Sequence, residues 1–334
     1  MKNNNIIEGS SEPLYLQVCD LIIKMIEEGS LRKNSKIPSV NQLVTQLGVS
    51  RVTVVNSYNY LRNQGIISSK HGKGFYVARE NDLRKKKVFL LFDAMNNYKE
   101  ILYHALIYGL GDSYSTNICF HYYNLKQFER FIRNNNGDYN HYVVLPHFNE
   151  DVSEILKILP QENLLMLDKD IPELTQCSGI FQQFDKDVYT ALEGGIHLLR
   201  KYNAINLFTG SDFQFIPDGI SKGINLFCIQ FGFKFNVIRD NGKDGINEGE
   251  VYLAFSENDL VTILQRSKLQ SLKPGSDFGL ISYDDTPLKA VLGDGITTIS
   301  TDFVHMGQMA AKMIREKIHE KIPNPCKLII RNSL

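Results

Sequence analysis

The stretch with the clearest chemical potential runs over residues 47–65 and reads LGVSRVTVVNSYNYLRNQG. The guanidinium of Arg51 can form two parallel hydrogen bonds to a guanine edge or bind a phosphate, and a methyl group of Val52 can contact a thymine methyl. The hydroxyls of Ser50 and Thr53, together with the amides at a helix start, can bind phosphate oxygens. The stretch therefore predicts contacts with double-stranded DNA.

A second basic segment follows over residues 66–77, IISSKHGKGFYV, and predicts two short strands joined by a glycine-bearing tip. Lys70, His71 and Lys73 in this tip supply positive charge toward phosphates. Gly72 permits a close approach to a nucleic-acid backbone because it has no side chain. The segment therefore predicts a basic hairpin beside the first stretch.

The spacing of apolar residues indicates which side chains face the solvent. Val54, Tyr58 and Leu61 fall at i, i+4 and i+7, so we expect them to pack inward on one helix. The opposite face of that helix, with Arg51 and Val55, then points outward. This pattern favours a helix that reads DNA over one that only fills a core.

Two further helices are expected before this one, a long helix over residues 14–26 and a short one after Ser39. Ser39 and Gln42 have the spacing of a capping box, and Gly48 is expected to turn the chain into the next helix. Three helices and a basic hairpin are typical of a winged helix-turn-helix, whose second short helix enters the major groove. The alternative is a small structural three-helix unit with a solvated basic face.

Residues 13–77 resemble the winged-helix head of the GntR family of bacterial regulators, through PLYLQV, GSLRKNSKIPSVNQL, LGVSRVTVVNSYNYLRNQGII and KHGKGFYV. The resemblance implies DNA contacts at Ser39, Arg51, Thr53, His71 and Gly72. Two family arginines are replaced here, by Asn41 and Val55, which implies a different base preference. The resemblance also implies a homodimer bound to a palindromic operator.

The charge distribution divides the chain. The net charge is zero, but residues 1–87 contain 14 Lys and Arg against 7 Asp and Glu, whereas the remainder contains 23 against 30. A basic head on an acidic body predicts a polyanionic partner for the head alone, or else reflects chance segregation across a domain boundary. The charged segment ARENDLRKKK, residues 78–87, is expected to be a linker.

After residue 87 the pattern changes to short apolar runs separated by helical segments, at residues 88–93, 118–123, 142–146, 164–168, 205–209, 233–238, 251–255 and 278–284. Apolar strands without alternation indicate a parallel sheet covered on both faces. We therefore predict an α/β protein, with a winged helix-turn-helix at residues 1–77, a linker at 78–87 and a doubly wound parallel-sheet domain at 88–334.

The second domain resembles lactose-repressor-type regulators and periplasmic sugar-binding proteins, most clearly through YDDTPL and TTISTDF, residues 283–288 and 297–303. The resemblance implies two α/β lobes around a cleft, with a small ligand at the carboxyl ends of the strands. It implies the following hydroxyl-binding residues: Asp93, Asn96, Asp168, Asn258 and Asp284. It also implies that Phe181 and Phe303 stack against a sugar ring.

Asp284 is the leading candidate among these residues, and its alternative role is that of a cap or turn residue. Asn258 could equally belong to a helix start. A family arginine is replaced by Ile220, where Asp218 or Lys222 could substitute, and a family glutamine is replaced by Thr301. These departures leave the ligand open, with a neutral monosaccharide as the leading expectation.

The sequence offers little support for catalysis or for metal or cofactor binding. The eight histidines lack metal-ligand spacing, no HExxH, GxSxG or GxxxxGK[ST] motif is present, and neither a catalytic residue, a metal nor a cofactor is expected. The five cysteines are widely spaced, as reduced buried residues are. No secretory signal or apolar stretch of membrane-spanning length appears, so we expect a cytoplasmic protein without a membrane partner.

These observations together predict a sugar-responsive, DNA-binding transcription regulator that acts as a repressor. An activator, or a regulator that responds to a non-sugar metabolite, is the nearest alternative. Two other classes are an enzyme fusion with an aminotransferase-like domain, and a binding protein whose head serves only for dimerisation. The aminotransferase alternative would require a longer chain and a recognisable cofactor lysine.

Overall fold

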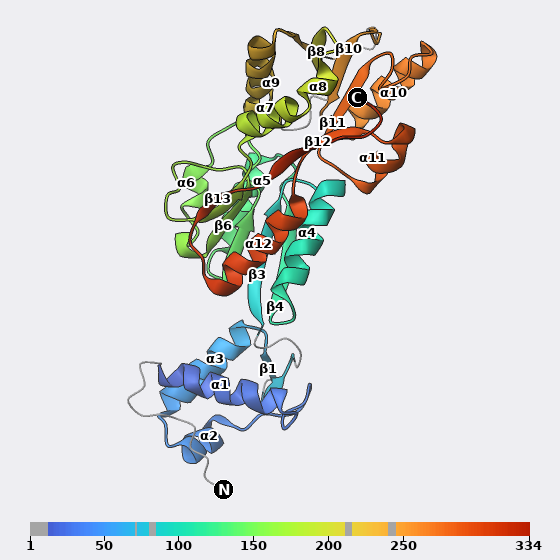
Figure 1. Ribbon diagram of the computed structural model, residues 1–334. Helices are drawn as coiled ribbons and strands as arrows, with labels where there is room; N and C mark the ends of the chain where they lie inside the picture. The colour runs from blue at the N-terminus through green and yellow to red at the C-terminus, as the bar shows by residue number, and fades with distance from the viewer. Residues whose placement is uncertain (1–12, 71, 80–84, 211–215, 240–244) are drawn as a thin grey trace. The chain divides into compact units, whose positions relative to one another are not determined.

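A computed structural model describes residues 13–70, 72–79, 85–210, 216–239 and 245–334 (Figure 1). The chain divides into two compact units, Met1–Lys86 and Lys87–Leu334. We call the first unit the head and the second unit the body. Each is described separately below.

The head consists of helices followed by a hairpin. The elements are α1 (Leu14–Glu27), α2 (Val40–Leu47), α3 (Arg51–Asn63) and the antiparallel strands β1 (Ile67–Lys70) and β2 (Gly74–Val77). Ser39 and Gln42 form the expected capping box on α2, and Gly48 ends that helix in the left-handed conformation, with φ of 70°. Ser50 caps α3. The predicted winged helix-turn-helix is therefore present.

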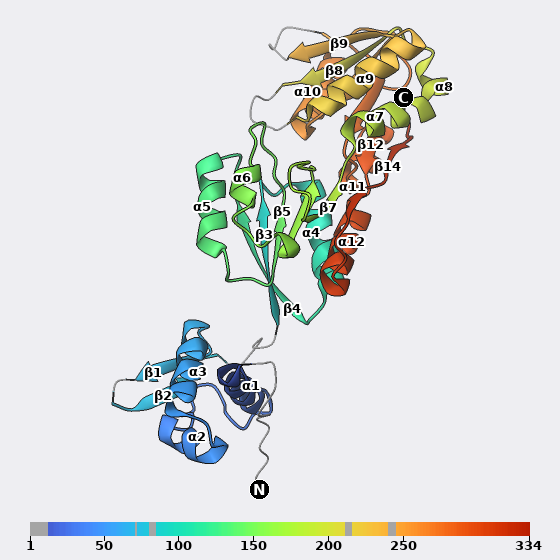
Figure 2. The ribbon, with the colours of Figure 1, turned by 90° about the vertical axis from the view of Figure 1, so that its left-hand side faces the viewer.

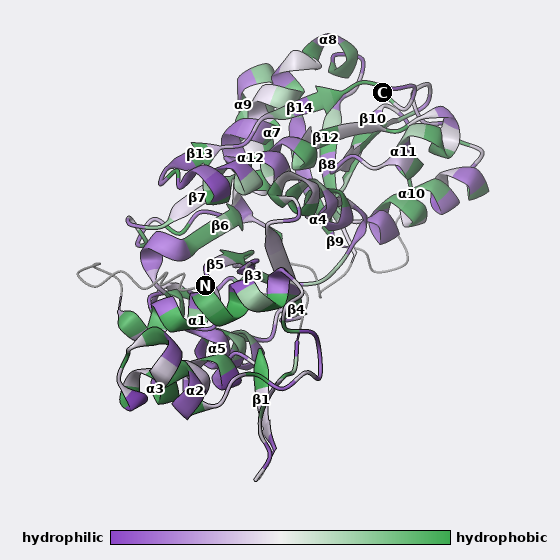
Figure 3. Ribbon diagram, turned by 90° about the horizontal axis from the view of Figure 1, so that it is seen from below, coloured by the Kyte–Doolittle hydropathy of each residue, from purple (hydrophilic) through white to green (hydrophobic). Residues whose placement is uncertain are grey.

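The head has its own hydrophobic core, in which Val54, Tyr58 and Leu61 of α3 are buried as predicted. They pack against a row of apolar residues on α1 that includes Val18 and Ile22, and the hydrophobic stretch along α1 is visible in Figure 3. Val55, which we expected to face outward, is only half-exposed.

The body contains two lobes, each built on a six-stranded sheet (Figure 2). The sheet of lobe 1 has the strand order β13-β7-β6-β5-β3-β4. Its strands are β3 (Lys86–Phe92), β4 (Tyr114–Phe120), β5 (His141–Val144), β6 (Leu164–Asp168), β7 (Ser178–Phe181) and β13 (Lys321–Pro323). Its helices are α4 (Asn97–Leu110), α5 (Leu125–Asn135), α6 (Ser153–Leu156) and α12 (Phe303–Glu316), with a 3-10 turn at Gln161–Asn163.

Lobe 2 has the strand order β14-β12-β11-β10-β8-β9. Its strands are β8 (Ala204–Thr209), β9 (Lys234–Arg239), β10 (Glu250–Ala254), β11 (Gly279–Tyr283), β12 (Thr297–Thr301) and β14 (Cys326–Ile329). Its helices are α7 (Phe184–Gly194), α8 (Ile196–Leu199), α9 (Asp218–Phe231), α10 (Glu257–Leu269) and α11 (Pro287–Val291), with a 3-10 turn at Leu292–Asp294.

Helices on both faces explain why the strands are apolar throughout. In β3, Val88, Leu90 and Phe92 pack against α4 and α12, whereas Phe89 and Leu91 face α5 and α6 on the other side. Lobe 2 repeats this arrangement, with α7, α8 and α9 over one face of its sheet and α10 over the other. The predicted doubly wound fold is therefore correct for both lobes.

Two details differ from the sequence prediction. The run at 118–123 is strand only up to Phe120, because Tyr122 and Tyr123 adopt left-handed conformations that turn the chain. The sheet of lobe 2 is also not purely parallel, since β14 pairs antiparallel with β12. β14 follows α12 and β13 of lobe 1 in the sequence. The chain therefore returns from lobe 1 to lobe 2, where β14 forms an edge strand of the sheet.

Candidate functional site

The exposed start of α3 carries the side chains expected to read DNA. Arg51 and Val52 are exposed, and 67% of the surface of Val52 is accessible. The Ser50 hydroxyl accepts a hydrogen bond from the Thr53 amide at 3.1 Å and lies 2.8 Å from the Thr53 hydroxyl. Similarly, the Ser39 hydroxyl accepts from the Gln42 amide at 3.3 Å. Both serines thus fix helix starts.

The β1–β2 hairpin presents a second group of exposed residues, Lys70, Gly72 and Lys73. Gly72 has a φ of 67°, a conformation that other residues rarely adopt. The ammonium of Lys70 lies 4.6 Å from the centre of the Tyr76 ring, which restrains this side chain on the hairpin. His71, another predicted contact, lies outside the described residues.

In the body, polar residues from the carboxyl ends of several strands line a cleft to which both lobes contribute. Its wider part has a volume of about 440 Å³, within the range of about 300–1,000 Å³ usual for small-molecule sites. Asn96 and Asn258 line this part, Asp93 and Asp168 line a narrower inner part, and Asp284 lines both. The structure therefore brings all five predicted hydroxyl-binding residues to one cleft.

The floor of the inner cleft is a chain of ion pairs. Asp93 is fully buried and accepts a hydrogen bond from the ammonium of Lys99, which is also buried. Nδ1 of His147 lies 3.1 Å from the same carboxylate oxygen, and Nε2 lies 2.8 Å from Asp168. Gln182 donates from Nε2 to Asp168 at 2.6 Å and accepts at 3.2 Å from the hydroxyl of Tyr283, a lobe 2 residue.

These contacts determine which groups on the floor are charged. Burial alone would favour neutral forms, but His147 and Lys99 hold the pKa of Asp93 well below its usual range. Burial also opposes charge on His147, yet the carboxylates of Asp93 and Asp168 raise its pKa to about 9. His147 is therefore an imidazolium at neutral pH, and it joins two carboxylates into a rigid unit.

Asp284 has a different environment. Its φ is 60°, and its Oδ1 is buried without a hydrogen-bond partner among the described residues. The hydroxyl oxygen of Thr286 is likewise buried without a hydrogen-bond partner among the described residues. Burial raises the pKa of Asp284 to about 7, against the opposing charge of Lys289, whose ammonium donates to the main-chain oxygens of Tyr283 and Asp284. Unpaired buried oxygens in a cleft are candidate ligand-binding groups.

Aromatic rings complete the walls of the cleft. Tyr98, Tyr123, Phe255 and Tyr283 line it, and the rings of Phe255 and Tyr283 stack with centroids 5.4 Å apart. The two faces come from different lobes, since Tyr98 begins α4 and Phe255 follows β10. The cleft thus combines polar acceptors with flat apolar surfaces.

Comparison with known proteins shows which family the head resembles. Residues 14–77 match the model of the gntR family of bacterial regulatory proteins. The transcriptional repressor YtrA of Bacillus subtilis is 32% identical over 98 residues, which cover 29% of this chain and 72% of YtrA. The chain belongs to the gntR family.

Other relatives share only part of their length with this gntR-family chain. The Escherichia coli mannosyl-D-glycerate transport/metabolism system repressor MngR is 41% identical over 69 residues, 21% of this chain and 29% of MngR. The Bacillus subtilis regulator YurK is 33% identical over 94 residues, 28% of this chain and 36% of YurK. The chain thus matches about a third of the length of these two proteins. These homologues are transcription regulators.

The body of this gntR-family protein has the fold of LacI regulators and periplasmic binding proteins. A periplasmic binding protein/LacI regulator from Alkaliphilus metalliredigens, solved with D-xylulofuranose, is 13% identical with a TM-score of 0.60 over 75% of this chain and 99% of that one. A LacI-family regulator from Enterococcus faecalis, solved with ribose, is 16% identical with a TM-score of 0.59 over 74% and 98%. At these identities the likeness concerns the fold alone.

Three predicted ligand residues do not line the cleft. The ring of Phe303 is buried in the core of lobe 1 and stacks on Tyr98 at 4.5 Å, so it supports a cleft residue from behind. Phe181 ends β7 and pairs in register with Asp168 and Pro323. Asp218 is exposed in the first turn of α9.

The structure also shows which residues take the capping and structural roles that were considered for Asn258 and Asp284. Asn258 does lie in the first turn of α10, as its alternative role implied, but Ser256 and Asp259 form the capping box of that helix. Asp285, rather than Asp284, is held in a structural ion pair with Arg331. Ile220 and Thr301, which replace family polar residues, are both buried, and the Thr301 hydroxyl donates to the main-chain oxygen of Pro325.

Three residues that line the cleft escaped the sequence analysis, namely His147, Gln182 and Lys289, and so did Lys99, which pairs with Asp93 without lining the cleft. His147 follows directly after a predicted strand, so the rule that polar residues after parallel strands line a ligand site could have found it. Lys99 lies in the first turn of α4 and offered no such signal.

Among the described residues, no cluster of His, Cys, Asp or Glu is arranged to hold a metal ion, and no helix is long and apolar enough to cross a bilayer.

Proposed function

We propose that this protein is a transcriptional repressor whose affinity for operator DNA is controlled by a neutral monosaccharide bound in the cleft of the body. In this proposal residues 1–77 bind DNA, residues 78–87 connect the units and residues 88–334 bind the effector. The observation that carries the proposal is the buried, unpartnered carboxylate oxygen of Asp284 in a cleft of suitable size, behind a winged-helix head.

Charge in the cleft favours a neutral effector. The ammonium groups of Lys99 and Lys289 already donate to protein oxygens, and the described lining contains no arginine. A phosphate or carboxylate would therefore face Asp284 without a free cation to balance it. Hydroxyl groups suit the cleft better, because they can donate to Asp284 while their carbon skeleton lies on an aromatic ring.

The coupling to DNA rests on closure of the lobes. Hydrogen bonds between described residues cross from one lobe to the other, for example from Asn97 Nδ2 to Glu257 Oε1 at 2.7 Å and from the Tyr283 hydroxyl to Gln182 at 3.2 Å. A sugar that contacts both lobes stabilises the closed arrangement and thereby changes the spacing of two heads on a palindromic operator. A differential affinity of about 1–3 kcal/mol between the two arrangements suffices for regulation.

We further propose that the active form is a homodimer. Exposed apolar side chains gather along α4, α11 and α12, where 89% of Tyr108 and 75% of Val291 are accessible, together with Leu288 and Val304. Tyr108, Leu288 and Val304 line one groove. An apolar face of this kind fits a symmetric contact between two copies of the chain, which two heads on a palindrome require.

The proposal is tested by measuring the melting temperature of the full-length protein with D-ribose, D-xylose, D-glucose, D-galactose and D-mannose, and then its retention of promoter-region DNA with the stabilising sugar. A bound sugar raises the melting temperature through mass action and releases the DNA. Stabilisation by a non-sugar metabolite alone contradicts the sugar assignment. Tighter DNA retention in the presence of sugar contradicts the assigned direction of regulation.

A further inference from the structure

The loop that presents Asp284 adopts a conformation that must be held in place. Asp284 follows the last residue of β11 and has a φ of 60°, in the left-handed region that residues other than glycine adopt less readily. Its amide donates to the oxygen of Ile299 at 2.8 Å, and the amide of Asp285 donates to the hydroxyl of Ser300 at 2.9 Å. The main chain at this position is thus fixed against β12.

The side chain of Asp285 provides the next restraint. Its two oxygens accept from both terminal nitrogens of Arg331, at 2.7 and 2.8 Å, and the Thr298 hydroxyl donates to Oδ1 at 3.0 Å. Burial would favour the neutral acid, but Arg331 and Thr298 lower the pKa of Asp285. Two parallel hydrogen bonds fix orientation as well as distance, so this fork aligns the residue next to Asp284.

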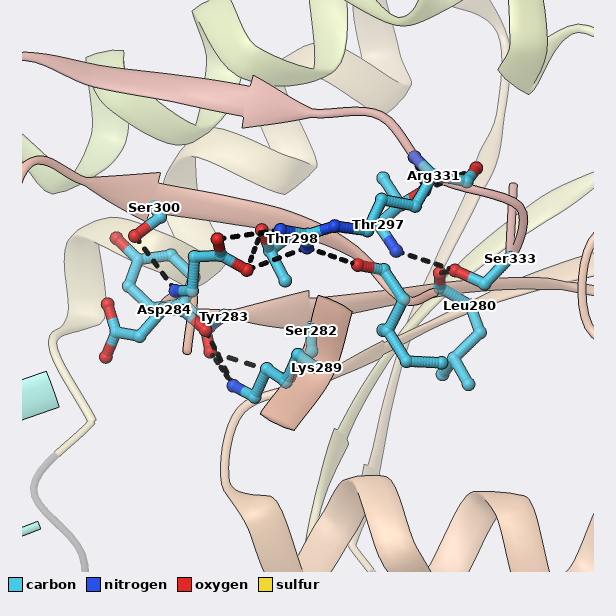
Figure 4. Close-up of polar contacts among 12 residues, drawn as sticks. Leu280, Ser282, Tyr283, Asp284, Lys289, Thr297, Thr298, Ser300, Arg331 and Ser333 are labelled. Atoms are coloured by element: carbon cyan, nitrogen blue, oxygen red, sulfur yellow. Dashed lines mark hydrogen bonds and ion pairs between the residues drawn. The ribbon is translucent and has the colours of Figure 1, made fainter. Parts of the chain in front are cut away.

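Arg331 is itself anchored by the chain terminus, as Figure 4 shows. Its amide donates to the Thr297 hydroxyl at 3.0 Å, and Nη1 donates to the oxygen of Ile296 at 2.8 Å. Two residues further on, the Ser333 hydroxyl donates to the oxygen of Leu280 at 2.6 Å and accepts from the Thr297 amide at 2.8 Å. The terminal segment is therefore bonded to both β11 and β12.

The far side of the same loop is closed by Lys289. Its ammonium donates to the oxygens of Tyr283 and Asp284 at 2.7 and 2.6 Å, and its own oxygen accepts from the Ile296 amide at 2.8 Å. The loop at residues 283–296 is thus restrained by the hydrogen bonds of Lys289 within the loop and by those of Arg331 from the neighbouring terminal segment. Arg331 is not among the described residues that line the cleft.

We propose that Arg331 and Asp285 are positioning residues for effector binding: the fork holds Asp284 in its cleft-facing orientation and sets effector affinity without touching the effector. This inference rests on the proposed function of the cleft. The competing explanation is that the pair only stabilises lobe 2, in which case its loss lowers the melting temperature and leaves sugar affinity unchanged.

The test compares full-length Arg331→Met and Arg331→Lys with Arg133→Met, which removes an arginine–carboxylate pair at 2.8 Å on α5 of lobe 1. Titration calorimetry with D-ribose, D-xylose, D-glucose, D-galactose and D-mannose measures affinity, and fluorescence anisotropy measures binding to promoter DNA without sugar. We expect Arg331→Met to weaken sugar binding about tenfold or more, because small misplacements of binding groups are costly. DNA affinity is expected to be unchanged, and Arg331→Lys is expected to restore part of the loss.

Asp285→Asn provides a second route if Arg331→Met does not fold, and it is expected to show the same loss without an additional effect in the double variant. Unchanged sugar affinity in folded variants overturns the inference while leaving the cleft assignment intact. If no sugar binds the wild type, the proposed function fails instead. Hydrogen exchange then decides the positioning role: faster exchange confined to residues 284–296 in Arg331→Met supports it, and unchanged exchange overturns it.

Discussion

The start of α3 with its hairpin and the cleft of the body hold their functional groups in opposite ways. Arg51, Val52 and Lys73 are exposed, on elements that are contiguous in sequence and packed by a small local core. In the cleft, Asp93 and Lys99 are almost fully buried and paired with each other. A surface for a large polyanion can be preorganised by helix starts alone, whereas a site for a small neutral molecule requires buried groups held by many neighbours.

Within the cleft, Asp168 and Asp284 repeat this contrast on a smaller scale. Asp168 ends β6 and Asp284 directly follows β11, and both have positive φ values, of 73° and 60°. Asp168 is saturated by His147 and Gln182, whereas Asp284 retains an unpartnered oxygen. Of these two carboxylates, Asp168 maintains the structure of the floor, and Asp284 is the one that we propose binds the effector.

Replacing Asp284 by Ala gives the largest expected effect, because this residue lines both parts of the cleft and carries a buried carboxylate oxygen without a hydrogen-bond partner among the described residues. We expect the affinity for the stabilising sugar to fall by about 10- to 100-fold, as hydrogen bonds to charged groups contribute about 1.5–3 kcal/mol. Titration calorimetry measures this loss. Asn258→Ala, in the wider part of the cleft, is the comparison variant, and an equal or larger loss there would shift the centre of the site away from Asp284.

Replacing Arg51 by Ala tests the exposed start of α3. Loss of a bidentate contact to a base weakens operator binding by about 1–3 kcal/mol and relaxes base preference at one position. Arg62→Ala is the matched control, since Arg62 is also exposed but lies in the last turn of the same helix. Anisotropy with promoter DNA measures both variants, and equal effects would argue that α3 contributes only charge.

A third prediction concerns pH. In the proposed site, ionised Asp284 accepts a hydrogen bond from the effector. Burial raises the pKa of Asp284 to about 7, Lys289 opposes this rise, Asp168 adds to it, and Lys99 and His147 lower the pKa. Effector affinity should therefore fall as pH drops below 7, by about tenfold between pH 8 and pH 6. Calorimetry across this range measures the change, and an Asp284→Asn variant should lack it. A flat profile in the wild type would mean that the effector does not require the charged form.

The same shift predicts the pH dependence of folding without effector. Because the pKa of Asp284 is raised on folding, its stabilising contribution is present below pH 4 and is lost as pH rises through about 7. Asp284→Asn should remove this penalty and raise the melting temperature at about pH 8 by about 2–4 °C for each kcal/mol recovered. A lower melting temperature of the variant at this pH would contradict the burial of an unpaired carboxylate.

The head and the cleft also differ in how far the sequence predicts them. The core of the head follows from apolar spacing on single helices, so Val54, Tyr58 and Leu61 were assigned correctly. In the body, Asp93, Asp168 and Asp284 were predicted from the resemblance to lactose-repressor-type regulators, and not from spacing alone. The pairing of His147 between two carboxylates depends on the order of strands in the sheet, which spacing does not contain.

The smallest expected effect is that of Lys73→Ala in the hairpin. Loss of one phosphate contact weakens DNA binding equally for all sequences and reduces the slope of log affinity against log salt by about 1. Anisotropy at several salt concentrations measures the slope. A change in base preference with this variant would place the hairpin against base edges instead of phosphates.

The central claim is that a sugar bound at Asp284 releases the head from DNA, and one measurement tests it most directly. Anisotropy of labelled promoter-region DNA is followed while the stabilising sugar is added to the wild type and to Asp284→Ala. The account predicts that both proteins bind the duplex at low salt and that only the wild type is released by sugar. Failure of the wild type to retain any promoter duplex, or equal release of both proteins, would contradict it.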